Sequence, residues 1–203
     1  MVHFNKIVTV LFHPILLPIL ATLFFFQTHN TGIHFRTESK IILIVAIGTF
    51  FVPMIIIYIL KKRKLIDNLR MSKISERRIP VICMIILFFT IGKSFYEIYY
   101  LIYLSQLFLG GSIALIICLI LFNQELKISL HMIGISSFIG FVISMSYLNE
   151  QNIIGIIAIA FLLAGIIANA RLKLKEHNLK EVLLGFTTGI ICQFISLGTI
   201  LLN

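Results

Sequence analysis

Charged residues are scarce in this chain, and acidic residues are the scarcest. Only 12% of the 203 residues are charged, and there are 8 Asp and Glu residues against 17 Lys and Arg residues. With 59% hydrophobic residues, the composition is that of a membrane protein with almost no soluble mass. The net charge of +9 therefore does not indicate nucleic-acid binding, because no soluble domain exists to present a groove.

The scarcity of metal ligands narrows the chemistry further. Cys83, Cys118 and Cys192 all fall inside apolar runs without metal-binding spacing, so we interpret them as small buried hydrophobic residues. No cluster of carboxylates is present to hold a metal ion, and we expect neither metal nor cofactor. The first apolar run is too long for the core of a cleavable signal peptide and lacks a small-x-small cleavage site.

Long apolar runs make up the rest of the sequence, and about 20 residues suffice for a helix to cross a bilayer. Because lipid offers no partner for an open sheet edge, we predict an all-α polytopic transmembrane bundle of six to seven spans, forming a single integral membrane domain over residues 1–203. The third run is the weakest, since its uninterrupted part, Pro80–Gly92, is short enough to be re-entrant. The predicted spans are Ile7–Phe26, Ile41–Leu60, Ile79–Tyr99, Tyr100–Phe122, Ile128–Tyr147, Ile153–Ala170 and Val182–Leu202.

Basic residues are distributed unevenly between the two faces of this bundle. With seven spans, most of the 17 Lys and Arg residues fall on the face that carries the N-terminus and the loops after the second, fourth and sixth spans. This bias predicts a cytoplasmic N-terminus and cytoplasmic basic loops.

The loop before the last span carries the most informative residues. It reads ARLKLKEHNLKE and places Arg171, His177 and Glu181 at the spacing Arg-x5-His-x3-acid. A carboxylate four residues after a histidine lies on the same helical face and can orient its ring, and an arginine can hold a phosphate group. A continuous helix would turn about 600° between Arg171 and His177, so the chain must break between them for the two side chains to converge.

Two further basic loops fall on the same predicted face. Before the fifth span, KISLH places Lys127 and Ser129 next to His131, which sits about one turn inside an apolar helix; an ionisable group there either faces the bundle interior or bonds a neighbouring helix. The loop after the second span reads RMSKISERRIP. Its candidate cations are Arg70, Lys73, Arg77 and Arg78. They either bind phosphate oxygens or reflect only the positive-inside rule and an affinity for anionic lipids.

Taken in order, these three loops resemble the type 2 phosphatidic acid phosphatase superfamily, whose signature is KxxxxxxRP, then PSGH, then SRxxxxxHxxxD. ARLKLKEHNLKE resembles the third motif, with Glu181 in place of Asp and Ala170 in place of Ser. ISLH resembles the second motif without its Pro and Gly, and RMSKISERRIP resembles the first with altered spacing. The resemblance covers roughly residues 70–203, and this chain is similar to a degenerate, Bacteroidetes-like membrane member of the family. This resemblance implies a multi-pass protein of a bacterial inner membrane.

The resemblance implies a membrane-embedded lipid phosphate phosphatase that needs no metal. His177, steered by Glu181, would attack phosphorus to give a phosphohistidine, and His131 would protonate the leaving oxygen. Family members from bacteria place this site on the periplasmic side, whereas the Lys and Arg bias here predicts the cytoplasmic side. The phosphate oxygens would be held by cations and a hydroxyl drawn from Arg171, Arg78, Arg77, Lys73, Arg70, Ser129 and Lys127.

Two alternatives use the same residues differently. The chain could be a catalytically inactive relative that serves as a scaffold or subunit of a membrane complex, or it could transport an anionic lipid. The absence of a convincing inverted repeat argues against the transporter. His13, which precedes Pro14 in the first apolar run, is best explained as part of a helix kink. In each case the expected partners are membrane lipids, with a phosphorylated lipid as the substrate of the enzyme.

Overall fold

The computed structural model describes residues 2–67, 71 and 73–202, and within these ranges the chain folds into helices without a β-strand. The elements are α1 (Val2–Leu11), α2 (Leu17–Thr28), α3 (Phe35–Ala46), the π-helix η1 (Ile47–Phe51), α4 (Val52–Lys62), α5 (Ile74–Tyr96), the 3₁₀-helix η2 (Tyr99–Leu101), α6 (Ile102–Asn123), α7 (Leu130–Leu148), α8 (Ile154–Lys173) and α9 (Leu179–Leu201).

Six helical segments of the described chain are long and apolar enough to cross a membrane, which confirms the prediction of an all-α multi-pass bundle. Each corresponds to one of the predicted spans from the second to the seventh, with ends that differ by a few residues. They are Phe35–Lys62, Ile74–Tyr96, Tyr99–Asn123, Leu130–Leu148, Ile154–Lys173 and Leu179–Leu201.

The first predicted span, Ile7–Phe26, is not one helix, and that prediction was wrong. The helix stops at Leu11 and a new one starts at Leu17, so that α2 has only 12 residues. Pro14 explains the break, because a proline has no N–H for the helical ladder and its ring clashes with the carbonyl four residues earlier. The short helix α1 therefore lies at the polar end of the bundle, and α2 continues from the break along the bundle to its opposite end, where His29 bonds Asn149 just past α7.

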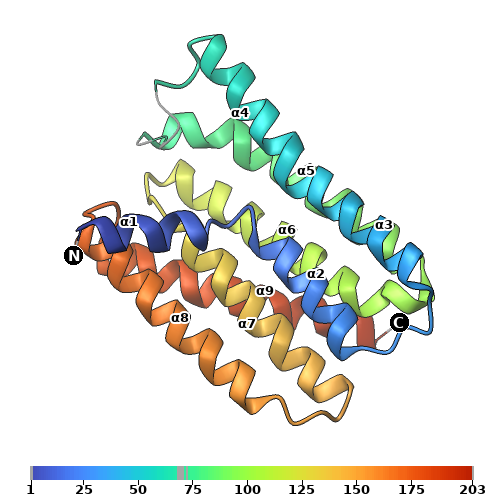
Figure 1. Ribbon diagram of the computed structural model, residues 1–203. Coiled ribbons are helices and arrows are strands. Elements are labelled where there is room, and N and C mark those ends of the chain that lie inside the picture. The colour runs from blue at the N-terminus through green and yellow to red at the C-terminus, as the bar shows by residue number, and fades with distance from the viewer. Residues whose placement is uncertain (1, 68–70, 72, 203) are drawn as a thin grey trace.

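The doubtful third span is a single helix. α5 runs without interruption from Ile74 to Tyr96 over 23 residues, so it is not re-entrant. It begins five residues earlier than the sequence indicated, which places Arg77 and Arg78 in its first two turns. Because α5 crosses the whole bundle, the starts of α5, α7 and α9 lie at the same end of the molecule as the ends of α6 and α8 (Figure 1).

α6 and α7 are the most buried spans and form the centre of the bundle. α5 packs along α6, α8 packs along α7, and α9 packs against both central helices. Small residues allow the closest of these approaches: Ser136 Oγ on α7 lies 3.4 Å from the Gly185 carbonyl oxygen on α9, and Ser137 Oγ lies 3.5 Å from that of Gly189. The predicted contact between the two histidine-bearing helices is present.

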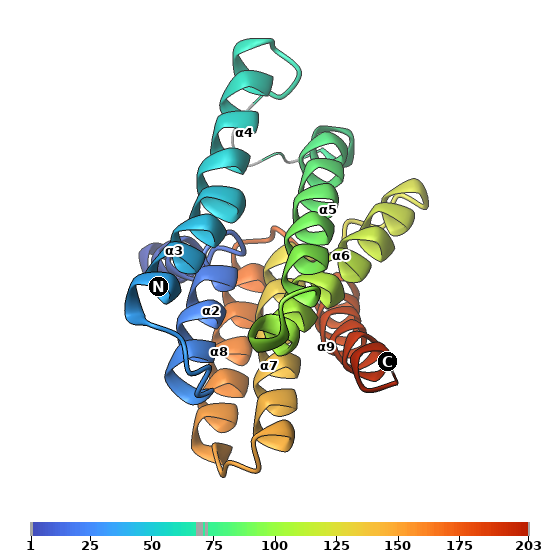
Figure 2. The ribbon, with the colours of Figure 1, turned by 90° about the vertical axis from the view of Figure 1, so that its right-hand side faces the viewer.

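α3, η1 and α4 form one long rod on the outside of the bundle, and its α4 end diverges from the central helices (Figures 1 and 2). The π-turn is explained by Pro53, which cannot donate a hydrogen bond to the Thr49 carbonyl. Instead the Val52 N–H bonds to the Ile47 carbonyl, five residues back. The rod thereby stays helical past the proline.

A single methyl group on α9 tests this packing. A Cβ at Gly189 would overlap Ser136 Oγ and the Ile133 carbonyl oxygen, whereas a Cβ at Gly198 on the same helix would meet nothing within 4 Å. We expect Gly189→Ala to lower the free energy of unfolding by about 1–3 kcal/mol. Gly198→Ala, the matched control, should be neutral or slightly stabilising. Thermal unfolding of the two variants in detergent micelles measures both effects, and equal melting temperatures would contradict this close packing.

Candidate functional site

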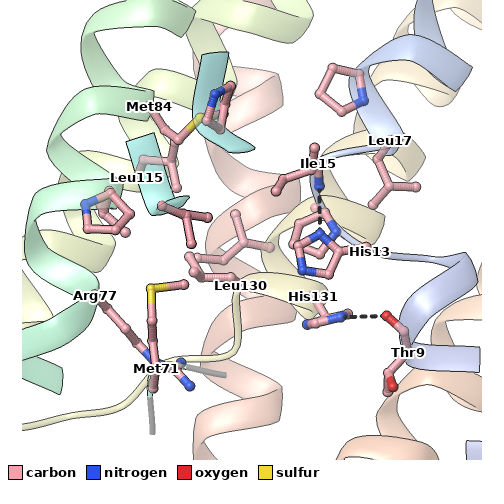
Figure 3. A pocket seen from close by; sticks show the side chains of 18 of the residues that line it. Thr9, His13, Ile15, Leu17, Met71, Arg77, Met84, Leu115, Leu130 and His131 are labelled. Atoms are coloured by element: carbon pink, nitrogen blue, oxygen red, sulfur yellow. Dashed lines mark hydrogen bonds between the residues drawn. The ribbon is translucent and has the colours of Figure 1, made fainter. Parts of the chain in front are cut away.

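A cavity of about 1100 Å³ opens at the end of the bundle where the basic loops meet. Its polar lining includes Arg77 at the start of α5, His131 at the start of α7, Arg171 at the end of α8 and His177 before α9. The cavity then continues along apolar side chains, and Figure 3 shows part of it from close by. These include Met84, Phe88, Leu107, Leu115 and Phe138.

The polar and apolar linings are separated along the bundle axis. Arg77 and Phe88 line the cavity from the same helix, and eleven residues of α-helix span about 16 Å. Likewise, His131 at the start of α7 and Phe138 two turns later both line it. The cavity is therefore complementary to an amphiphilic anion, because one end is lined by cations and the rest by apolar side chains.

The end of α8 brings Arg171 and His177 together. The helix closes with Lys175 in the left-handed conformation (φ 53°), and the Glu176 N–H bonds back to the Arg171 carbonyl at 3.2 Å. This is the hydrogen-bond pattern of a Schellman motif, which reverses the chain direction within a few residues. The break that the sequence required between Arg171 and His177 is present, and both side chains line the same cavity.

His177 is buried and its ring is held at one nitrogen. Nδ1 lies 2.7 Å from Glu181 Oε2 and 2.9 Å from the Lys127 carbonyl oxygen. Both partners can only accept, if Glu181 is ionised, so Nδ1 carries the hydrogen and shares it between them. In the neutral ring Nε2 then keeps its lone pair, and it has no hydrogen-bond partner among the described residues.

The surroundings of His177 favour this neutral ring. Burial, followed by the positive charges of Arg171, Arg77 and Lys127, lowers the pKa of His177 to about 3. The hydrogen bond to the Lys127 carbonyl acts in the opposite direction, but burial and the three nearby cations outweigh it. At neutral pH His177 is therefore an uncharged base with a fixed tautomer.

Glu181 serves two structural purposes at once. Its backbone N–H bonds to Asn178 Oδ1 at 2.9 Å, and its carboxylate accepts from the Asn178 backbone N–H at 3.4 Å, which forms a capping box at the start of α9. The same carboxylate oxygen accepts from His177 Nδ1. The helix cap thus fixes the carboxylate that fixes the histidine.

Two arginines at the polar end of the cavity are buried without full compensation. Arg77 and Arg171 are only 6% and 8% exposed. Arg77 Nε donates to the Met71 carbonyl at 2.7 Å, which directs the guanidinium, whereas Arg171 Nε has no partner within the described chain. The closest carboxylate to Arg171 is Glu176, at 3.9 Å. Buried guanidinium groups of this kind are suited to hold an anion that enters the cavity.

His131 is anchored by the broken first helix. Its Nε2 lies 3.0 Å from the Thr9 carbonyl oxygen, which can only accept, so Nε2 carries a hydrogen (Figure 3). Its Nδ1 has no hydrogen-bond partner in the part of the chain that the structure describes. The sequence left open whether His131 faces the interior or bonds a neighbouring helix, and it does both.

The other predicted site residues that the structure describes do not line the cavity. Lys127 bonds the Glu176 carbonyl through Nζ at 3.2 Å, and its own carbonyl holds His177. Ser129 is fully buried behind the site, where its Oγ has no partner among the described residues. Lys73 is exposed and pairs with Asp67 at 2.7 Å, Arg78 is exposed, and Arg70 lies outside the described residues.

Sequence reasoning missed several contributors. The Thr9 and Lys127 carbonyls act through the backbone, for which no side-chain pattern exists. Glu176 lies between Arg171 and His177 in the printed motif and lines the cavity. Lys6, Lys61 and Lys62, which the sequence indicated only as positive-inside charge, also line it. Lysine, arginine and histidine side chains therefore surround the polar end of the cavity.

Comparison of the chain with protein families, with curated proteins and with solved structures finds no match. The described residues contain no group of three or more His, Cys, Asp or Glu side chains placed to hold a metal ion. The chemistry available to the site therefore follows from its own geometry.

The lowered pKa of His177 makes a prediction about stability. Unfolded, this histidine binds a proton below pH about 6.5, whereas folded it stays neutral down to about 3. Stability from this residue is therefore complete above pH 6.5 and is lost as the pH falls toward 3, by up to about 1.4 kcal/mol per pH unit. Between pH 6.5 and 5 the wild type should lose about 2 kcal/mol more than His177→Asn, which keeps an N–H donor near the Nδ1 position but cannot titrate. Unfolding curves at both pH values provide the measurement, and parallel losses would contradict a neutral, buried His177.

Proposed function

We propose that this protein is a membrane-embedded phosphatase that hydrolyses a phosphorylated lipid through a phosphohistidine on His177. The observation that carries the proposal is a neutral histidine, held at Nδ1 by a carboxylate and a carbonyl, beside two buried arginines in a cavity that is otherwise apolar. The resemblance of the three loops to the type 2 phosphatidic acid phosphatase superfamily supports the same reading.

The first step is attack by the lone pair of His177 Nε2 on phosphorus. As the N–P bond forms and the bond from phosphorus to the leaving oxygen breaks, the ring becomes cationic, and Glu181 stabilises that charge through Nδ1–H. Arg77 and Arg171 bind the phosphoryl oxygens and offset the negative charge that they carry in the transition state. Both arginines are fixed by burial before the substrate arrives.

His131 supplies the proton that the leaving oxygen needs. A dianionic phosphate in the cavity favours the doubly protonated ring, whose Nε2–H stays on the Thr9 carbonyl while Nδ1–H faces the ligand. Nδ1 gives its proton to the leaving alkoxide and becomes a base. It then takes a proton from the water that attacks the phosphohistidine, which releases inorganic phosphate and restores both histidines.

The apolar body of the cavity determines the class of substrate. A soluble phosphate ester would leave about 16 Å of apolar wall along α5 exposed to water, whereas the chains of a lipid would cover it. The site lies at the basic end of the bundle, and by the positive-inside rule this end is cytoplasmic. A phosphorylated lipid with its head at the membrane surface fits both features.

Phosphate release from phosphatidic acid in mixed micelles tests the proposal. We expect His177→Asn to lower kcat by at least about a thousandfold, because it keeps the Nδ1-type hydrogen bond and removes the nucleophile. Arg77→Ala should cost about 10²–10³-fold, as the loss of one transition-state donor does. Arg78→Ala, next to it but exposed outside the cavity, should cost less than about threefold.

The controls separate chemistry from folding. Arg36→Ala, exposed at the far end of the bundle at the start of α3, should match the wild type in rate and in melting temperature. Equal phosphate release from wild type and His177→Asn, or none from either, would contradict the proposal and favour a scaffold. Movement of the lipid between leaflets without phosphate release would favour a transporter.

A further inference from the structure

The break in the first apolar segment leaves backbone groups without their helical partners. In a continuous helix the Thr9 carbonyl would accept from the His13 N–H, but that N–H bonds the Val10 carbonyl instead, at 3.3 Å. The Thr9 carbonyl is thereby free to bind His131. The break is thus directly connected to the site.

The same break fixes the ring of His13. The Ile15 N–H donates to His13 Nδ1 at 3.4 Å, which is the arrangement of an Asx turn with a histidine in place of Asn or Asp. Because a backbone N–H can only donate, Nδ1 must hold a lone pair, and the hydrogen of the neutral ring is on Nε2. His13 therefore has a defined tautomer, the opposite of that of His177.

His13 Nε2–H has no acceptor among the described residues, although the ring lines the cavity. The ring stands edge-on against His131, with centroids 5.3 Å apart and an interplanar angle of 79°. Figure 3 shows the two histidines on one side of the cavity and Arg77 with Met71 across from them. The half-buried ring therefore leaves Nε2–H open to the cavity, where a ligand can accept its hydrogen bond in place of water.

The other polar groups around His13 are mostly donors and cations. Arg171, Arg77 and Lys6 line the same cavity, and the Thr9 carbonyl accepts from His131 rather than from His13. Glu176 is the one carboxylate in the lining, and it is directed toward Arg171. Since no described residue accepts from His13 Nε2–H, a molecule in the cavity can accept this hydrogen bond, and an anion with several oxygens suits the surrounding charge.

We propose that His13 is a further ligand-binding residue, whose Nε2–H donates a hydrogen bond to an oxygen of a phosphate group held by Arg77 and Arg171. The proposal rests on the proposed function only for the identity of the anion. Because the donor is neutral and its turn is closed by the backbone, His13 binds without titrating, unlike His131. The unwound first segment thus contributes a donor to the site as well as the anchor of His131.

Two substitutions separate this role from a structural one. His13→Asn places an oxygen where Nδ1 accepts from Ile15, so it keeps the turn and loses the Nε2 donor. His13→Gln reaches the Nε2 position with an amide N–H and disturbs the turn. His34→Asn is the matched control, because His34 is exposed at the far end of the bundle before α3.

Binding of inorganic phosphate to the purified full-length protein in detergent micelles, measured by isothermal titration calorimetry, tests the proposal. We expect His13→Asn to raise the Kd about tenfold or more without lowering the melting temperature, since a hydrogen bond to a charged group is lost. His13→Gln should restore the Kd to within about threefold of wild type, and His34→Asn should not change it. Wild-type affinity in His13→Asn with weaker binding in His13→Gln would assign His13 to the turn alone. Absence of phosphate binding by the wild type would also overturn the proposal.

Parallel measurement of phosphate release distinguishes this proposal from the proposed function. One outcome is that turnover depends on His177 while His13→Asn binds phosphate and turns over like the wild type. The proposed role of His13 is then wrong, and the proposed phosphatase activity is supported. The other outcome is that phosphate binding depends on His13 but the wild type releases no phosphate from lipid. The proposed phosphatase activity is then wrong, and the proposed anion-binding role of His13 is supported.

Discussion

The hydrogen bond from His177 Nδ1, shared between the Glu181 carboxylate and the Lys127 carbonyl, is the interaction on which the site depends. It joins the α8–α9 loop to the α6–α7 loop, because the His177 ring and the Lys127 carbonyl belong to residues 50 apart in the sequence. It also determines which ring nitrogen is free. Without it, the ring could turn, the tautomer would be undefined and no fixed basic nitrogen would lie near the two arginines.

The site is assembled from helix ends, and each end uses a different device to place its side chain. A Schellman motif turns the chain after Arg171, a capping box sets Glu181, and a proline break exposes the Thr9 carbonyl. Helix ends are where a membrane bundle can present backbone polar groups, because the interior of each span has already satisfied its own. The concentration of polar chemistry at one end of an apolar bundle follows from this constraint.

Much of this arrangement could be predicted from the sequence, because hydropathy and motif spacing act locally. The six spans follow from apolar length, and the pairing of His177 with Glu181 follows from the helical repeat. Contacts between distant segments could not be predicted in the same way. The bond from His131 to Thr9 joins residues 122 apart in the sequence, and it depends on a helix break whose position the His-Pro pair indicates but whose exposed carbonyl it does not.

The choice between neighbouring cations was also beyond the sequence. Arg77 and Arg78 are equally good candidates in the printed motif, and only the start of α5 at Ile74 decides that Arg77 turns inward and Arg78 outward. Lys127 contributes its charge, which the sequence indicated, and also its carbonyl, which holds His177 and which no side-chain pattern indicates. In each case the residue type indicated a candidate, and the position of the helix boundary determined which of its groups faces the site.

Trapping of the phosphorylated protein tests the central claim most directly. Protein mixed with phosphatidic acid carrying ³²P in its headgroup, and quenched in base within the first turnover, should retain label on His177, bonded through Nε2 and released by mild acid. His177→Asn should retain none. Label on any other residue, or phosphate release from the wild type without a labelled histidine under conditions that preserve phosphohistidine, would contradict it.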